Sequence, residues 1–337
     1  MVDRKVAVLR ADASGLIGVG HVMRSLALGE ALLAAGFDVV LASVDLPAGM
    51  REEANKCEIT VVDLQCEPFG SDDALATLAL NGAVLVIDGY SFEREFFGEL
   101  ENRTTHYVVI DDNVETKALA PSVVINQNPH ATTEMYAHLS GNPKLLLGLQ
   151  YALLRREVRE TAKLSVVPVA GKVFVAMGGS DFLGLTGPIV GALKDLDIEL
   201  CVAVGPTNSR RKEIEDVVQS IPRAQVIHQA DYIAELASSS LAILAAGSSL
   251  WEAAALGVPS IGLIVADNQL DASVSSKKMG FSISIDVRND ANIELIHSLV
   301  GNLLSLPNES LEKMRTSAKN GIDENGSSRV CDEIGKS

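Results

Sequence analysis

The stretch KVAVLRADASGLIGVGHVMRSLALGEALLAA, from Lys5 to Ala35, decides the fold. An apolar, β-branched run at Lys5–Arg10 predicts a buried strand. Glycines follow at positions 15, 18 and 20, and the pattern from about Val22 to Ala35 predicts a helix that Gly36 can terminate. A strand, a glycine-rich turn and a helix in this order indicate a parallel α/β unit with an anion site at the turn.

The same alternation of short apolar runs and helical patterns continues through the first half of the chain. Each run is apolar on both faces and ends in polar residues, as central parallel strands do. Further strands are expected at Asp38–Ala42, Ile59–Val62, Ala83–Asp88, Tyr107–Asp111 and Val123–Asn126. Ligands bind at the carboxyl ends of such strands, so the residues that follow each run are candidate site residues.

A second α/β series follows a mixed apolar and charged segment, Lys144–Pro168, which we interpret as the interdomain connection. Its strands are expected at Lys172–Met177, Glu199–Val204, Gln225–Ile227, Leu241–Ala245 and Pro259–Val265, with helices such as Asn208–Ser220, Gln269–Met279, Ile293–Leu304 and Glu309–Lys319. The 337 residues suit two domains of roughly 150 residues each. We expect Rossmann-like domains over residues 1–150 and 165–337, with a terminal helical segment that crosses back to the first.

Composition excludes several classes of partner. The chain has 28 basic and 44 acidic residues, a formal net charge of −16, which repels nucleic acid and anionic membranes. No uninterrupted apolar run reaches about 18 residues, and the first residues have no signal-peptide profile, so we expect a cytoplasmic protein. Four cysteines without a Cys-x-x-Cys pair and six histidines without a ligand spacing predict neither a disulfide framework nor a metal site.

The glycine turn does not match a known phosphate-loop pattern. Neither G-x-G-x-x-G nor G-x-x-x-x-G-K-[ST] occurs there, so NAD and ATP lose their main support and no cofactor is expected. Gly18 and Gly20 would let a ligand approach the backbone N–H groups, and His21 lies at the start of the helix. The helix dipole disfavours an imidazolium at that position, so His21 is a candidate general base; the alternative is a capping or packing histidine.

Two glycine–serine turns in the second half precede helix starts. Gly179 and Ser180 follow one strand, and Gly247, Ser248 and Ser249 follow another. Backbone donors and hydroxyls at helix N-termini suit a diphosphate, although each turn alone is also an ordinary serine N-cap. In the same region, Glu252 could accept hydrogen bonds from ribose hydroxyls, and polar residues Asn268 and Gln269 follow the next strand.

Polar residues also follow strands of the first half. Tyr90 comes after the strand that ends at Asp88, and Asn126 ends another. These side chains could contact sugar hydroxyls and amides. The adjacent acids Asp111 and Asp112 raise the alternative of a metal site, but no third ligand stands at a supporting spacing, and such acids usually cap the following turn.

Taken together, these motifs resemble the UDP-2,4-diacetamido-2,4,6-trideoxy-β-L-altropyranose hydrolases of pseudaminic acid biosynthesis, over most of the chain. The segments that match are residues 10–14, 17–24, 125–128, 147–155, 177–181, 246–252 and 266–269. The sequence departs from that family at Ala253–Ala255, at Met177 and at Phe182. These departures bear on the identity of the sugar.

The resemblance implies a GT-B-type α/β fold, with two Rossmann-like domains whose parallel sheets face each other across a cleft. It implies metal-independent hydrolysis of the UDP-sugar at the anomeric carbon, with His21 as base. Sugar or positioning contacts are then expected from Arg10, Asp12, Gly18, Gly20, Tyr90 and Asn126. UDP contacts are expected from Gly179, Ser180, Gly247, Ser248, Ser249, Glu252, Asn268 and Gln269.

Two other functions share these sequence features. A UDP-sugar glycosyltransferase of the same fold would differ only in whether the site admits an acceptor hydroxyl or water. A non-catalytic nucleotide-sugar binding protein would bind UDP without turnover and would give His21 no special role. The sequence specifies no protein partner.

Overall fold

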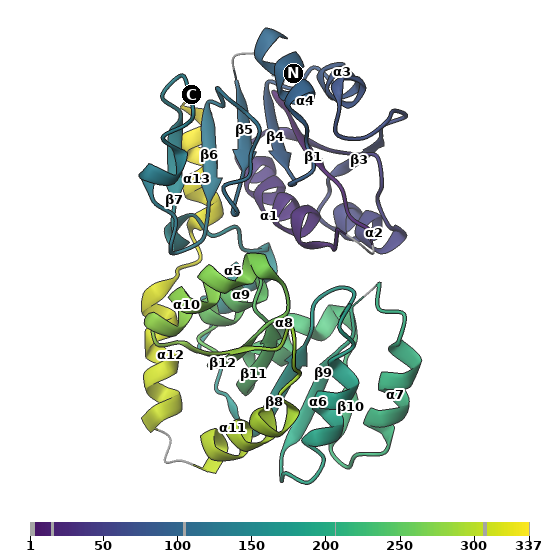
Figure 1. The fold of residues 1–337 in the computed structure, drawn as a ribbon, viewed down its shortest axis with the longest axis vertical. Helices are drawn as coiled ribbons and strands as arrows, with labels where there is room; N and C mark the ends of the chain where they lie inside the picture. The colour runs from purple at the N-terminus through teal and green to yellow at the C-terminus, as the bar shows by residue number, and fades with distance from the viewer. Residues whose placement is uncertain (1–3, 15–16, 104–105, 206, 306–308, 337) are drawn as a thin grey trace. The chain divides into compact units, whose positions relative to one another are not determined.

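The structure is a computed structural model that describes residues 4–14, 17–103, 106–205, 207–305 and 309–336. Two compact units divide the chain (Figure 1). Unit 1 comprises residues 1–156 and 325–337, and unit 2 comprises residues 157–324. The helical segment 325–337, which the sequence analysis counted within the second domain as a segment that crosses back, thus packs with the first half of the chain.

Unit 1 contains a seven-stranded parallel sheet in the order β3-β2-β1-β4-β5-β6-β7. Its strands are β1 (Val6–Ala11), β2 (Asp38–Ser43), β3 (Thr60–Asp63), β4 (Val84–Asp88), β5 (Tyr107–Ile110), β6 (Val123–Asn126) and β7 (Lys144–Leu147). Its helices are α1 (Gly20–Ala34), α2 (Ala48–Lys56), α3 (Ser71–Leu78), α4 (Arg94–Arg103) and α13 (Gly326–Gly335). The chain leaves β1 in one direction to β2 and later returns on its other side to β4, so the switch point of the sheet lies between β1 and β4.

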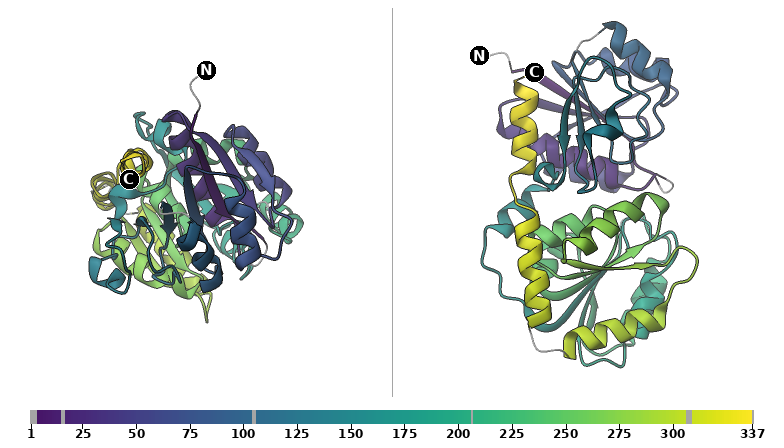
Figure 2. Two further views of the ribbon diagram at one scale, coloured as in Figure 1. Left: turned by 90° about the horizontal axis from the view of Figure 1, so that it is seen from above. Right: turned by 60° about the vertical axis from the view of Figure 1, so that its left-hand side comes forward.

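Alternating side chains of β1 divide the interior of unit 1 into two cores. Leu9 and its alternate neighbours pack with α1, α2 and α13 on one face of the sheet. Val8 points to the opposite face and packs with α3 and α4, where four phenylalanines and Tyr107 gather. The period of two along a strand produces this division. In Figure 2, α13 is drawn in yellow alongside the sheet.

Unit 2 contains a six-stranded parallel sheet in the order β10-β9-β8-β11-β12-β13. Its strands are β8 (Val169–Ala176), β9 (Glu199–Ala203), β10 (Ala224–Val226), β11 (Ser239–Ala245), β12 (Ser260–Ile264) and β13 (Ser282–Asp286). Its helices are α5 (Arg156–Ala162), α6 (Thr186–Ala192), α7 (Arg211–Gln219), α8 (Tyr232–Ala237), α9 (Ser249–Ala255), α10 (Leu270–Lys278), α11 (Ile293–Ser305) and α12 (Glu309–Gly321). Here the switch point lies between β8 and β11.

The predicted α/β class is confirmed, with two corrections to the strands. Residues 144–147, which we had assigned to the interdomain connection, form β7 and pair with β6. The segment Ser282–Asp286, for which no strand was predicted, forms β13 beside β12. Both are edge strands, and their mixed polar and apolar residues lack the uniform apolar pattern of central strands.

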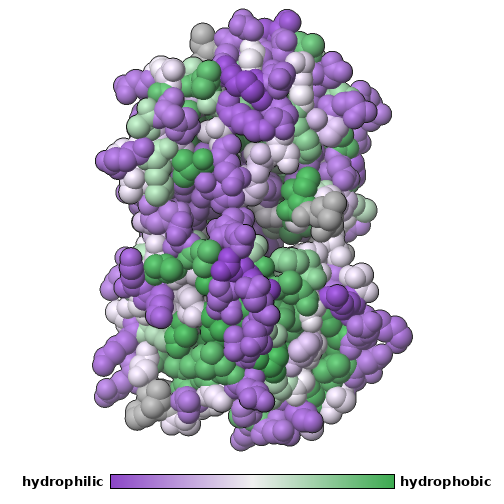
Figure 3. Space-filling model, viewed as in Figure 1, coloured by the Kyte–Doolittle hydropathy of each residue, from purple (hydrophilic) through white to green (hydrophobic). Residues whose placement is uncertain are grey.

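The two units differ in the hydropathy of the surface drawn in Figure 3. Hydrophilic residues cover most of unit 1 on the face drawn in Figure 3, and hydrophobic residues gather mainly over unit 2. Within the described part of the chain, no helix combines the length and apolar character that a membrane span requires.

Candidate functional site

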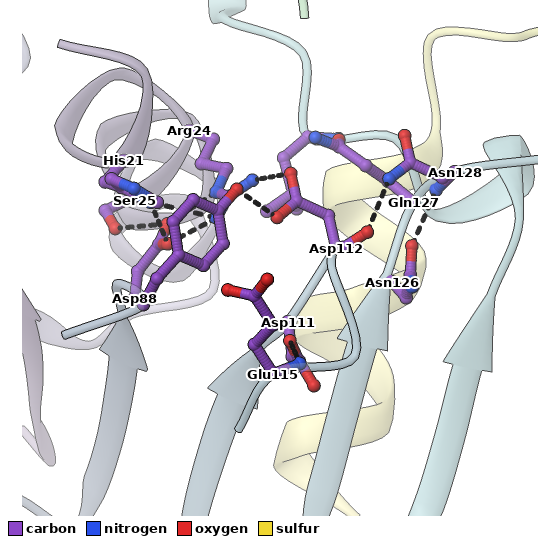
Figure 4. A network of polar contacts seen from close by, with 12 residues as sticks. His21, Arg24, Ser25, Asp88, Asp111, Asp112, Glu115, Asn126, Gln127 and Asn128 are labelled. Carbon is purple, nitrogen blue, oxygen red and sulfur yellow. Dashed lines mark hydrogen bonds and ion pairs between the residues drawn. The ribbon is translucent and has the colours of Figure 1, made fainter. Parts of the chain in front are cut away.

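His21 lies at the switch point of unit 1, paired with a carboxylate. It is the second residue of α1, which begins directly after the glycine turn that follows β1. Its Nδ1 is 2.7 Å from Oδ1 of Asp88, the last residue of β4 (Figure 4). Both side chains are buried, with His21 6% exposed and Asp88 1% exposed. The adjacent strands β1 and β4 therefore bring together two residues that are 67 positions apart in sequence.

Arg24 is the third member of this cluster. It lies one helical turn after His21 on the same face of α1. Its Nε and Nη2 donate to both carboxylate oxygens of Asp88, at 2.7 and 2.6 Å. Its Nη1 donates to Oδ2 of Asp112 from the β5 end. Burial opposes a charged guanidinium, but Asp112 and Asp88 outweigh it and raise the pKa of Arg24 well above its ordinary value.

The contacts of Asp88 determine the tautomer of His21. Burial raises the pKa of Asp88, but Arg24 and His21 more than offset this effect, so its pKa is lowered and the group is a carboxylate. A carboxylate at 2.7 Å requires a proton on Nδ1, because two lone pairs at that distance repel. Arg24 Nη2 also lies 3.0 Å from Nδ1, but one of its two protons bonds Asp88 Oδ1, and the ionised Asp88 carboxylate, which can only accept, still takes the proton of Nδ1. Nε2 is then the basic nitrogen, and it has no hydrogen-bond partner among the described residues.

Tyr90 closes the cluster from the loop after β4. Its hydroxyl donates to Oδ1 of Asp112 at 2.5 Å, and its ring lies edge-on to the His21 ring with centroids 4.6 Å apart. Burial and the Asp112 carboxylate raise the pKa of Tyr90 above its ordinary value. The phenol therefore stays a donor, and Tyr90 lies beside the candidate base, while its contact with substrate stays a prediction.

A second layer fixes the backbone around Asp112. Asn128 Nδ2 donates to the Asp112 carbonyl at 3.0 Å. Asn126 Nδ2 donates to Tyr136, whose hydroxyl donates to the Asp111 carbonyl at 2.6 Å. Asn126, which we had predicted as a substrate contact, is fully buried with both ends of its amide bonded to protein. At this position Asn126 supports the loops that follow β5 and β6.

Asp111 acts as a turn cap. Its carboxylate accepts hydrogen bonds from the backbone N–H groups of Glu115 and Thr116, at 3.0 and 3.3 Å. Burial raises its pKa. Among the residues that the structure describes, no group of three or more His, Cys, Asp or Glu could hold a metal ion.

Arg10 and Asp12 lie in a separate buried ion cluster. Arg10, 0% exposed, donates to both oxygens of Asp73 at 2.7 and 2.6 Å, and its Nη2 is 2.8 Å from Asp12 Oδ2. Asp12 Oδ1 accepts from Ser43 Oγ at 2.7 Å and from the Val44 N–H at 2.8 Å. These contacts join the ends of β1, β2 and α3. Both side chains thus bond within the protein, and their expected sugar contact stays a prediction.

The glycine turn leaves room in front of α1. Gly18 has φ +81°, a conformation that favours glycine, and its N–H donates to the Ser14 carbonyl at 2.8 Å. A Cβ at Gly18 or at Gly20 would meet no atom of the described residues within 4 Å. The N-cap residue of α1 is Val19, whose side chain cannot cap the helix. Gly15 and Leu16 of the same turn lie outside the described residues.

In unit 2, the predicted nucleotide residues lie at the ends of adjacent strands β8 and β11. Gly179 and Ser180 follow β8, in a turn whose Gly179 carbonyl accepts from the Thr207 backbone N–H at 3.2 Å. The carboxylate of Asp181 accepts from the N–H groups of Leu185 and Thr186 at 2.8 and 3.0 Å. Asp181 thus occupies the N-terminus of α6, which we had expected to be open to a diphosphate.

The turn after β11 leads through Gly247, Ser248 and Ser249 into α9. The side chain of Ser248, the N-cap residue, makes no capping hydrogen bond. Gln269 accepts from the Val265 N–H through Oε1 at 2.9 Å, and its Nε2 would lie 3.9 Å from a Cβ at Gly247. Two predicted nucleotide residues from different loops therefore lie side by side. Glu252 is half-buried on α9, and Asn268 is exposed.

Sequence reasoning identified His21 and Tyr90 but assigned no role to Arg24 or to Asp112 as its partner. Arg24 could have been found from its spacing of three residues from His21, which places both on one helix face. Asp88 ends an otherwise apolar strand, which also marks it as a site residue. The contacts of Arg24 with Asp88 and Asp112 depend on the order of the strands in the sheet, which the spacing of residues in the sequence does not give.

Comparison with known proteins supports the fold. No protein-family model matches the chain. The spore coat polysaccharide biosynthesis protein SpsG of Bacillus subtilis is 22% identical over 283 residues, 82% of each chain. Acinetobacter baumannii MurG superposes with a TM-score of 0.67 at 15% identity, covering 99% of this chain and 100% of MurG.

Two ligand-bound structures are similar at the same level. Staphylococcus aureus MnaA with UDP gives a TM-score of 0.69 at 10% identity, covering 99% of this chain and 96% of MnaA. The rhamnosyltransferase SpnG with thymidine diphosphate gives a TM-score of 0.65 at 18% identity, covering 97% of this chain and 100% of SpnG. At these identities the likeness concerns the fold alone, and the chain has the GT-B-type fold with two parallel α/β units.

Proposed function

We propose that this chain hydrolyses a UDP-linked 2,4-diacetamido-2,4,6-trideoxy sugar of the altrose form, releasing UDP and free sugar for pseudaminic acid biosynthesis. The observation that carries the proposal is the buried His21–Asp88 pair, which leaves Nε2 basic at the switch point of unit 1. The sequence motifs given above supply the substrate class. SpsG, named for polysaccharide biosynthesis, and the UDP-bound MnaA structure support a nucleotide-sugar substrate.

In the proposed reaction, Nε2 of His21 takes a proton from water while the water oxygen forms a bond to the anomeric carbon. The bond from that carbon to the diphosphate oxygen breaks, and its electron pair leaves with UDP. Asp88 holds the imidazole in the required tautomer and stabilises the imidazolium that forms. The proton then passes to solvent, which restores the base.

The nucleotide is assigned to unit 2. The turn at Gly247–Ser249 offers backbone donors and hydroxyls for the diphosphate, and Gln269 Nε2 lies beside it. Gly179 and Ser180 follow the neighbouring strand β8, and Glu252 of α9 is the residue that we propose accepts from ribose hydroxyls. Because Asp181 occupies the α6 N-terminus, the proposal places the diphosphate at the β11 turn and not at α6.

A glycosyltransferase is the second candidate, favoured by the folds of MurG and SpnG. The same base could deprotonate an acceptor hydroxyl, which would then attack the anomeric carbon in place of water. The two candidates differ in one measurable requirement: a transferase needs an acceptor for UDP release, and a hydrolase does not.

The test is UDP release from the diacetamido-trideoxy-altrose substrate without acceptor, in EDTA and ¹⁸O-labelled water. Hydrolysis at carbon gives EDTA-resistant release with ¹⁸O in the sugar. His21→Ala should lower kcat by on the order of 10²- to 10⁴-fold and leave UDP affinity unchanged. His138→Ala, at an exposed histidine of the same unit, is the matched control.

The alternatives give different results. Release only with an added acceptor would assign the chain to the transferases, and label in UDP would place the cleavage at phosphorus. UDP binding without turnover on any substrate tested would identify a binding protein. Near-normal turnover of His21→Ala would remove the base assignment.

A further inference from the structure

Arg24 makes the His21–Asp88 pair different from a simple histidine–carboxylate dyad. In a simple dyad, the carboxylate charge favours the imidazolium and makes the histidine harder to deprotonate. Here the same carboxylate is bonded at both oxygens by a guanidinium, at 2.7 and 2.6 Å. That guanidinium also lies 3.0 Å from Nδ1 of His21. A positive charge therefore contacts both members of the pair.

The charged groups that face His21 can be named element by element. Arg24 comes from α1, Asp88 from β4, Tyr90 from the following loop and Asp112 from the end of β5. With His21 neutral, their formal charges sum to one negative charge. Without Arg24, the Asp88 carboxylate would remain bonded to the imidazole and the Asp112 carboxylate to Tyr90, in a buried environment where charge interactions are strong.

Several other charged residues on the elements that pack against α1 have partners elsewhere. Arg10 of β1 pairs with Asp12 and Asp73, Asp38 of β2 with Arg4, Arg51 and Lys56 of α2 with Asp63 and Glu53, and Glu333 of α13 with Lys144. The balance of charge at His21 is therefore set within the cluster itself.

We propose that Arg24 is a positioning residue that keeps His21 in its neutral, proton-accepting form, by neutralising Asp88 and by placing a guanidinium against Nδ1. The inference rests on the proposed role of His21 as base. Arg24 also bonds Asp88 and Asp112 at once, so it fixes the carboxylate that orients the imidazole. Asp88 can therefore orient the imidazole, while Arg24 offsets the negative charge of Asp88 that would otherwise favour the imidazolium.

The test measures the protonation of His21 directly, without turnover. Side-chain ¹H–¹⁵N NMR of the full chain, with the His21 signal assigned by His21→Ala, gives its titration midpoint. Arg24→Gln should raise that midpoint by about 1 to 3 pH units, because two carboxylates lose their counter-charge. Arg24→Lys retains the charge and should raise it less.

Asp112→Asn should shift the His21 midpoint in the opposite direction, and it is the second test variant if Arg24→Gln does not fold. Removing one carboxylate should lower the His21 midpoint. Arg51→Gln, which removes a surface arginine paired with Asp63, should leave it unchanged. A midpoint that stays in place or falls in Arg24→Gln and Arg24→Lys, or one that rises in Asp112→Asn, would overturn the proposal.

Activity then separates this inference from the proposed function. If the chain is the hydrolase, the acid limb of kcat/KM against pH should move upward in Arg24→Gln together with the NMR midpoint, and activity should recover at higher pH. A simple packing role for Arg24 would lower activity at every pH without moving the limb. If no substrate is turned over, the proposed function fails while the NMR shifts still decide the role of Arg24.

Discussion

At the scale of single residues, the site consists of side chains whose contacts determine one another. Asp88 bonds His21, Arg24 and Ser25, so it can be in only one orientation. His21 could be predicted from its place after a glycine turn at a helix start. Its partners could not, because Asp88 and Asp112 reach it only through the order β1-β4-β5 of the strands.

Replacement of the orienting carboxylate should affect chemistry more than binding. In Asp88→Asn, the amide no longer requires a proton on Nδ1, so the productive tautomer of His21 loses its preference. We expect kcat to fall by on the order of 10³- to 10⁴-fold with little change in KM. Ser25→Ala, which removes only a 3.3 Å contact to Asp88, should cost less than about tenfold. Steady-state kinetics decide this, and equal losses in both variants would argue against an orienting role.

Glu101 should make stability depend on pH. Burial raises its pKa, but hydrogen bonds from Arg94, Leu119 and Tyr107 outweigh burial and lower its pKa from 4.5 to about 2. Because the folded pKa is lowered, the stabilisation is present above about pH 4.5 and disappears as the pH falls towards 2. Urea unfolding of Glu101→Gln should therefore show a deficit at pH 6 that shrinks with acid. The exposed Glu95→Gln should show a small difference without this trend.

At the scale of elements, the turns that follow β8 and β11 are held by neighbours that sequence patterns do not reveal. Gly205, after β9, approaches the turn after β8 so closely that a Cβ would lie 2.2 Å from the Gly179 carbonyl oxygen and 2.5 Å from that of Gly178. These are backbone atoms, so the turn itself would have to move. The glycine–serine turn was predicted from sequence, but the requirement for glycine opposite it was not.

Gly205→Ala should therefore displace the turn that carries Gly179 and Ser180. If that turn contacts UDP, calorimetry should show UDP affinity reduced by about tenfold or more, since a shifted contact loses roughly one hydrogen bond to a charged group. Gly191→Ala on α6, where a Cβ would meet nothing within 4 Å, is the matched control. Unchanged affinity in a folded Gly205→Ala protein would remove this turn from the nucleotide site.

At the scale of the whole molecule, the α/β class and most central strands could be predicted, because buried parallel strands have uniform apolar patterns. The edge strands β3 and β10 were predicted, but β7 and β13 were not, because Lys144 in β7 and the serines of β13 interrupt the apolar pattern. The return of a terminal helical segment to the first domain was expected, and α13 packs within unit 1. Which residues return could not be predicted, because the apolar face of α13 is typical of any packed helix.

The contact of α13 with unit 1 can be tested at Gly326. A Cβ there would lie 2.2 Å from the carbonyl oxygen of Ala152 and 2.6 Å from its nitrogen. Gly326→Ala should destabilise unit 1 by about 1 to 3 kcal/mol through this overlap. Gly335→Ala, at the other end of the same helix with nothing within 4 Å, should be neutral or slightly stabilising. Chemical denaturation measures both, and equal stabilities would mean that the helix does not pack closely on Ala152.

Because Val330, Cys331 and Ile334 of α13 complete a core that otherwise belongs to residues 7–153, the chain must close unit 1 late during synthesis. Residues 157–324 all leave the ribosome before α13 does, so unit 2 can reach its final form while the first core still has an open face. Multidomain chains commonly fold from the N-terminus onwards. Here unit 2 can be complete before unit 1 is, because the face of α1 that α13 covers stays open until residues 326–335 have been made.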